Sequence, residues 1–115
     1  MERPFDVFAA DCPSREVWEH ATGRWGALVL GALADGPLRF AALRRAVGGI
    51  SDRMLSQTLQ GLERDGLVHR DDRGTNPPHV EYSLTPIGRE VGARVVDLVA
   101  TLHAVMPAVM AARAG

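Results

Sequence analysis

The sequence predicts a mainly α-helical domain of the α+β class, in which short helices precede a β-hairpin and a long C-terminal helix follows it. Three observations lead to this prediction. Two helical segments are separated only by a short turn containing Gly48 and Gly49. Two strand-like stretches flank the turn-forming segment "RGTNPP". Apolar residues at helical spacing then run from Pro86 almost to the C-terminus.

Length and composition indicate one domain with its own core. The chain has 115 residues, of which 46% are apolar, and we expect a single domain over residues 1–115. The single cysteine excludes an internal disulfide and fits a reducing compartment. The sequence contains no recognisable signal peptide, and runs such as "WGALVLGALA" are too short for a membrane span. A cytoplasmic protein without a membrane segment is therefore expected.

The first two elements are expected to be short helices. Cys12-Pro13 predicts a helix start, because proline is favoured at the first helical position, and this helix is expected to reach about Ala21. A second helix is expected from Arg24 to Ala34. It is apolar nearly all round, which predicts a place in the core. Asp35-Gly36-Pro37 ends it.

A helix-turn-helix is expected next. A stub of strand at Leu38–Phe40 leads into the helix "AALRRAV", and Gly48-Gly49 provides a tight turn. The following helix is expected from Ser51 to Asp65, because serine is a good N-cap and Gly66 is the residue type that most often follows a helix. Two helices joined by a short glycine-containing turn are typical of the helix-turn-helix.

The helix over residues 51–65 has two contrasting faces. Leu55, Leu59 and Leu62 form an apolar stripe, and long arginine and glutamine side chains lie opposite. In the major groove of DNA, arginine can bond guanine and glutamine can bond adenine. On a lone helix such a face is more often merely solvated. The residues that we expect to contact DNA are Arg39, Ser51, Arg53, Ser56, Gln57, Gln60, Arg64 and Arg73.

The charge distribution supports this interpretation modestly. The net charge is −1, but residues 36–80 carry seven arginines against five acids, whereas residues 1–35 carry three arginines against six acids. The local surplus of positive charge therefore coincides with the helix expected to bind DNA.

The strand-like stretches "LVHRDD" and "HVEYSL" complete a winged helix-turn-helix, with Arg73–Pro78 as the wing at the minor groove or the DNA backbone. Thr85-Pro86 starts the last helix, which is expected to reach about Ala112, and Pro107 is expected to kink it or end its regular part. We expect residues 12–91 to form the winged-helix core and residues 86–113 to form the dimerisation helix.

The last helix carries more apolar residues than a domain of this size is expected to cover. A homodimer is therefore predicted, and the alternative is that the helix packs entirely on its own domain. The residues expected at the dimer interface are Val17, Val95, Leu98, Val99, Leu102 and Met106.

The sequence predicts neither an enzyme nor a cofactor site. The four histidines are scattered without metal-binding spacing, and no glycine-rich phosphate loop follows a strand. Ser51 is better explained as a helix cap than as a nucleophile.

From Cys12 to about Val91 the chain resembles the HxlR family of bacterial winged-helix transcription regulators, within the MarR-like group. The matching motifs are "CP" (Cys12-Pro13), "GRW" (Gly23–Trp25), "GPLRFAAL" (Gly36–Leu43), "GISDRMLSQTLQGLERDGLVHR" and "PPHVEYSLTPIG" (Pro77–Gly88). Arg24 replaces the usual lysine, and Ala42 stands where an acid is common. The resemblance implies a nucleoid-associated homodimer that binds a roughly palindromic double-stranded operator as a repressor or activator.

Two alternatives stay open. In several members of this family a cysteine at the position of Cys12 senses oxidants or electrophiles, and a helix N-terminus favours the thiolate. An oxidant or a small molecule would then be the effector, and any disulfide would form between subunits or with a small thiol. Otherwise Cys12 is a packed, inert thiol beside Trp18. The second alternative is a winged helix that docks a protein and does not bind DNA.

Overall fold

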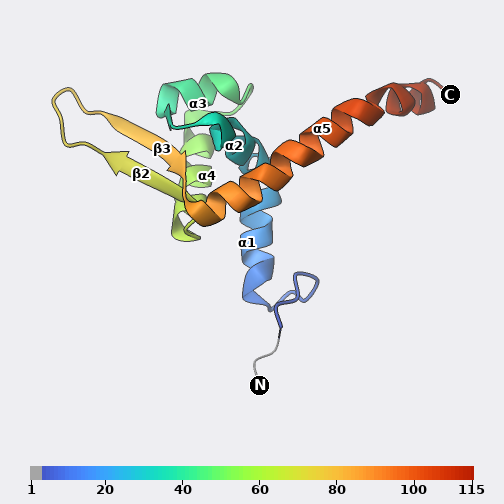
Figure 1. The fold of residues 1–115 in the computed structure, drawn as a ribbon, viewed down its shortest axis with the longest axis horizontal. Helices are drawn as coiled ribbons and strands as arrows, with labels where there is room; N and C mark the ends of the chain where they lie inside the picture. Colours follow the sequence, from blue (N-terminus) through green and yellow to red (C-terminus); the bar gives the residue numbers. More distant parts are fainter. Residues whose placement is uncertain (1–3) are drawn as a thin grey trace.

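The structure is a computed structural model that describes residues 4–115 (Figure 1). Its elements follow in the order α1 (Pro13–Thr22), α2 (Gly26–Ala32), the 3-10 turn η1 (Leu33–Asp35), β1 (Leu38–Arg39), α3 (Phe40–Ala46), α4 (Asp52–Arg64), β2 (Val68–Asp72), β3 (Val80–Leu84) and α5 (Pro86–Ala114). Helices α3 and α4 form the helix-turn-helix, and β2 and β3 form the hairpin that projects from it. The predicted winged helix-turn-helix is confirmed.

The sheet has three antiparallel strands in the order β1-β3-β2. Tyr82 of β3 pairs with Leu38 on one side and with Arg70 on the other. The short strand before α3 is thereby attached to the hairpin, so that the helix-turn-helix and the wing share one framework. The core beneath them is entirely apolar, and its largest fully buried side chains are Leu30, Leu33, Leu43, Leu55, Leu62 and Val29.

Helix starts follow the predicted capping residues. Pro13 occupies the first turn of α1, the Ser51 hydroxyl accepts a hydrogen bond from the Met54 amide at 3.1 Å, and the Thr85 hydroxyl accepts one from the Gly88 amide at 3.0 Å. Gly66 adopts φ +75° just beyond α4, the left-handed conformation that glycine tolerates best.

Several boundaries differ from the prediction, among them the end of α2, which passes into the 3-10 turn η1 at Leu33. Helix α2 begins at Gly26 instead of Arg24, because the chain turns at the end of α1 and passes close to it: a Cβ at residue 26 would lie 1.8 Å from the His20 carbonyl oxygen. Phe40, expected in a strand, instead begins α3. Short segments of this kind depend on the packing around them more than on local propensity.

Helix α5 starts inside the domain and ends outside it. Gly88 and Gly92 are buried in its first turns, whereas most of the later residues are exposed and the ribbon leaves the domain (Figure 1). The helix continues through Pro107 to Ala114, so the proline does not end it, although the ribbon changes direction near its red end. By length and composition alone α5 could also span a membrane, which the sequence analysis did not expect.

Candidate nucleic-acid interface

The polar and apolar residues of α4 separate as predicted. Leu55, Leu59 and Leu62 are buried, so the opposite side of the helix faces solvent. The side chains exposed there are Arg53, Gln57, Gln60 and Arg64, with Ser56 half-buried at their edge. Ser51 uses its oxygen to cap the helix and keeps its hydroxyl proton as a donor. Five of the predicted DNA-contacting residues thus share one helix surface, with Ser51 at its N-terminal end.

Several arginines at the helix-turn-helix have no acidic partner. Among residues 4–115, no carboxylate lies within salt-bridge distance of Arg45, Arg53 or Arg64. Arg44, by contrast, bonds Asp52 at 3.1 Å and thereby neutralises the acid in the first turn of α4. The guanidinium groups of α4 therefore keep all their donors for an external anion.

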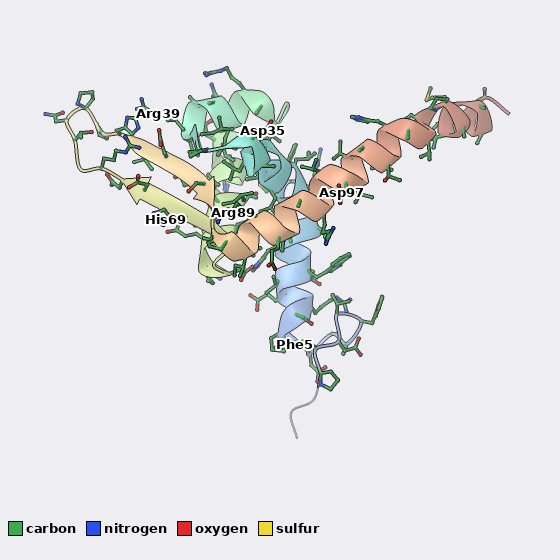
Figure 2. All side chains as sticks on the ribbon, viewed as in Figure 1. Phe5, Asp35, Arg39, His69, Arg89 and Asp97 are labelled. Carbon is green, nitrogen blue, oxygen red and sulfur yellow. The ribbon has the colours of Figure 1, made fainter. Side chains whose placement is uncertain are left out.

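Arg39 lies where the helix-turn-helix meets the wing (Figure 2). It is the last residue of β1 and the N-cap residue of α3, and its Nη2 donates a hydrogen bond to the Pro78 carbonyl oxygen at 3.3 Å. This contact connects the C-terminal end of the wing loop to the helix-turn-helix. Arg39 is expected to contact DNA, and its side chain also makes this hydrogen bond within the domain.

Arg73, the predicted contact of the wing, is held by two acids. Its Nη2 lies 3.0 Å from Glu81 Oε1, and its Nε lies 3.4 Å from Asp71 Oδ2. Glu81 also bonds His79 Nε2 at 3.1 Å. The wing is therefore a network of paired charges. A phosphate has to compete with these carboxylates for Arg73.

A groove of about 570 Å³ runs beside α4. Ser51 and Gln57 line it on the α4 side, and Arg24 and Trp25 line it on the opposite side. The Arg24 guanidinium stacks on the Trp25 ring, 4.9 Å from its centroid. Arg24 thus borders the polar face of α4, although it is distant from that helix in sequence.

One contact across the domain escaped the sequence analysis. His20 Nδ1 of α1 lies 2.6 Å from Asp65 Oδ2 at the C-terminal end of α4. The two residues are 45 positions apart. Nothing in the sequence pattern could pair them, because only the packing of α1 against α4 brings them together.

The predicted interface residues on α5 differ in exposure. Leu98 is 57% exposed and Leu102 is 49% exposed, and Val99 and Met106 are also exposed. Val95 is half-buried and packs against the core of its own domain. Val17 of α1 is exposed. The alternative that α5 packs entirely on its own domain is therefore wrong for the described chain.

Cys12 is the N-cap residue of α1 and is half-buried. Its Sγ lies 3.3 Å from Ser14 Oγ and accepts a hydrogen bond from the Asp6 amide at 3.3 Å. Trp18 is 53% exposed. Within residues 4–115, no group of His, Cys, Asp and Glu side chains is arranged to hold a metal ion.

A helix-turn-helix with an exposed arginine and glutamine face, followed by a wing, defines the class of winged helix-turn-helix transcriptional regulators. The family model described as HxlR-like helix-turn-helix matches residues 21–109. The chain belongs to this family. It is a DNA-binding regulator of transcription, not an enzyme, and as such a cytoplasmic protein.

Individual relatives agree with this assignment. The chain is 50% identical over 108 residues to the HTH-type transcriptional regulator YtfH of Escherichia coli, a match that covers 94% of this chain and 86% of YtfH. The solved structure of the transcriptional regulator YtfH from Salmonella typhimurium is 49% identical, with a TM-score of 0.90, covering 97% of this chain and 100% of that one. The solved structure of the redox regulator HypR in its oxidized form is 35% identical to this chain, with a TM-score of 0.73. The match covers 81% of this chain and 96% of the HypR chain.

Proposed function

We propose that this regulator binds a roughly palindromic duplex as a homodimer, with α4 of each subunit in the major groove and the wing, residues 73–78, at the minor groove or backbone. The observation that carries the proposal is the exposed face of α4, where Arg53 and Arg64 have no acidic partner among the described residues. These donors match the edges of bases and the phosphates beside them. Binding of this kind would associate the protein with the nucleoid.

The test is binding to a duplex selected from a random pool with the wild-type protein. Arg53→Ala and Gln57→Ala should each cost about 1–3 kcal/mol and relax the base preference at one position per half-site. Folding should survive, because both side chains are exposed. Arg94→Ala on α5 serves as the control for loss of one exposed arginine. Unchanged binding by both α4 variants would contradict the proposed recognition face.

The dimer proposal is supported by the exposed apolar residues of α5. Beyond Val95 this helix presents Leu98 and Leu102 to solvent, and a second subunit would cover them. Two subunits would place their recognition helices about 34–36 Å apart, which is one turn of DNA. A genome-wide footprint of the bound protein would then show paired half-sites at this spacing.

Two alternatives to a DNA-binding homodimer, docking of a protein and insertion of α5 into a membrane, predict different binding results. If the domain docks a protein instead of DNA, the selected duplex will show no salt-dependent binding, because phosphate contacts release counterions. If α5 inserts into a membrane, the protein will sediment with lipid vesicles. If α5 forms the dimer interface, the protein will be a dimer when no lipid is present.

A second candidate function is redox sensing through Cys12. It is supported by the half-buried thiol at the N-terminus of α1 and by the similarity to HypR, which is described as a redox regulator. Within this chain there is no second cysteine, so oxidation would join Cys12 to a small thiol or to another subunit. Mass determination distinguishes an inert thiol from the disulfide that forms after mild peroxide treatment and from the adduct that a quinone forms with a reactive thiolate.

A further inference from the structure

A histidine of α1 is bonded to the end of the helix proposed to read DNA. His20 Nδ1 donates a hydrogen bond to Asp65 Oδ2 over 2.6 Å, and the other ring nitrogen lies 4.0 Å from Glu16 Oε1. The side chain of Asp65 is only 10% exposed and that of His20 is 28% exposed. A hydrogen bond shielded from water to this extent holds its two groups more firmly than one at the open surface.

The position of Asp65 explains why it needs this partner. Asp65 is the C-cap residue of α4, where the negative end of the helix dipole disfavours a carboxylate. The ring N–H of His20 offsets that penalty. His20 itself lies in the last turn of α1, where the dipole of that helix favours a basic side chain. The bond thus joins the C-terminal ends of two helices.

His20 lies close to two glycines. A Cβ at Gly61 of α4 would lie at ordinary contact distance, 3.6–3.9 Å, from atoms of the His20 ring, so the ring faces this helix with room for one methyl group between them. The His20 carbonyl oxygen lies so close to Gly26 that only glycine fits there. Helices α1, α2 and α4 therefore meet at His20, and its bond to Asp65 links α1 to the C-terminal end of α4.

We infer that His20 is a positioning residue that sets the orientation of α4 relative to α1. The inference rests on the proposed function, in which α4 enters the major groove, and on the expectation that α1, which exposes Val17, belongs to the dimer interface. In such a dimer, the angle between α1 and α4 determines how far apart the two recognition helices lie. The bond between His20 and Asp65 then determines which spacing of half-sites the dimer accepts.

The experiment measures binding to duplexes of different spacing. The duplex selected with the wild-type protein is lengthened or shortened by one base pair at its centre, and affinities are compared within each protein. His20→Ala should reduce the preference for the selected spacing by roughly fivefold or more. Base preference inside each half-site should remain, because the α4 side chains are unchanged. Asp65→Ala should behave in the same way, and the double variant should lose little more.

Two amide variants provide the matched control. An asparagine amide can occupy the place of the histidine Nδ1, whereas a glutamine amide reaches the place of Nε2, beside Glu16. His20→Asn should therefore keep the preference for spacing, and His20→Gln should lose it. This pair decides the question if His20→Ala does not fold, since both variants retain a polar side chain at the same position.

The outcomes separate the inference from the proposed function. A wild-type protein without salt-dependent binding to duplex DNA contradicts the proposed function. Normal binding with no preference for spacing, or with the same preference in His20→Ala and His20→Gln, overturns the inference alone. An equal loss of affinity at every spacing also overturns it, because it would show that His20 only stabilises the fold.

Discussion

At the scale of single residues, ion pairs determine how much positive charge the wing offers to DNA. Arg73 lies between Asp71 and Glu81, so a phosphate contact requires at least one of these pairs to loosen. Exposed ion pairs of this type contribute only about 0–1 kcal/mol, and a phosphate can therefore displace them. Sequence analysis could identify Arg73 at the turn, but it could not show which acids face it.

The ion pairs of Arg73 predict opposite effects for two substitutions in the wing. Arg73→Ala should reduce the slope of log affinity against log salt by about 0.9 if the side chain makes one phosphate contact. Glu81→Gln should raise affinity at low salt, because it removes a negative charge 3.0 Å from Arg73. Binding titrations over a range of salt concentrations measure both effects. An unchanged slope in Arg73→Ala would make the wing a purely structural hairpin.

Two glycines allow a second prediction at this scale. A Cβ at Gly88 would lie 1.9 Å from the Leu67 carbonyl oxygen, whereas a Cβ at Gly61 would meet the His20 ring at an ordinary 3.6 Å. Gly88→Ala should therefore destabilise the fold by about 1–3 kcal/mol, since the backbone has to move. Gly61→Ala should be neutral or stabilising by up to about 1 kcal/mol, because alanine favours helix.

Urea denaturation with a common m-value measures both changes in the free energy of unfolding. The two variants control for each other, because each adds one methyl group to a helix. Equal stability of the two proteins would contradict the close approach of α5 to Leu67.

At the scale of elements, α5 exposes apolar side chains that nothing in a single subunit covers. Leu98→Asp and Leu102→Asp should weaken dimerisation and DNA affinity together, because each places a charge on the apolar surface expected at the interface. Ala104→Asp, on the opposite side of the helix by its spacing, is the control. Sedimentation at micromolar concentration measures the oligomeric state. A stable wild-type monomer that binds its selected duplex at full strength would contradict the dimer.

Helix α4 shows how far local sequence can predict an element. Ser51 and Gly66 set its start and its end through interactions within a few residues, and the spacing of the leucine stripe shows directly which face packs on the core. The start of α2 could not be predicted in this way. It depends on the contact between Gly26 and the His20 carbonyl, which exists only after α1 has packed against α2.

At the scale of the whole molecule, regulation by Cys12 requires a change at α1 to reach α4. If oxidation shifts one subunit against the other, the spacing of the recognition helices changes and the duplex no longer fits both. Peroxide or quinone treatment should then lower the affinity of the wild-type protein and leave Cys12→Ser unchanged. Titration of the selected duplex before and after treatment is the measurement. Unaltered affinity of the treated wild-type protein would leave Cys12 as a packed thiol.

The sequence by itself determined the order of elements, the caps of α4, the polar face with Arg53 and Gln57, and the membership of the chain in its family. These features depend on residue types at short spacing, which the sequence displays directly. The tertiary structure alone decided that His20 meets Asp65, that Arg73 is shared between two acids, and that α5 leaves the domain. The first depends on the packing of helices distant in the chain, the second on the side-chain geometry within the hairpin, and the third on how much of α5 the domain can cover, and in each case many weak contacts decide the geometry together.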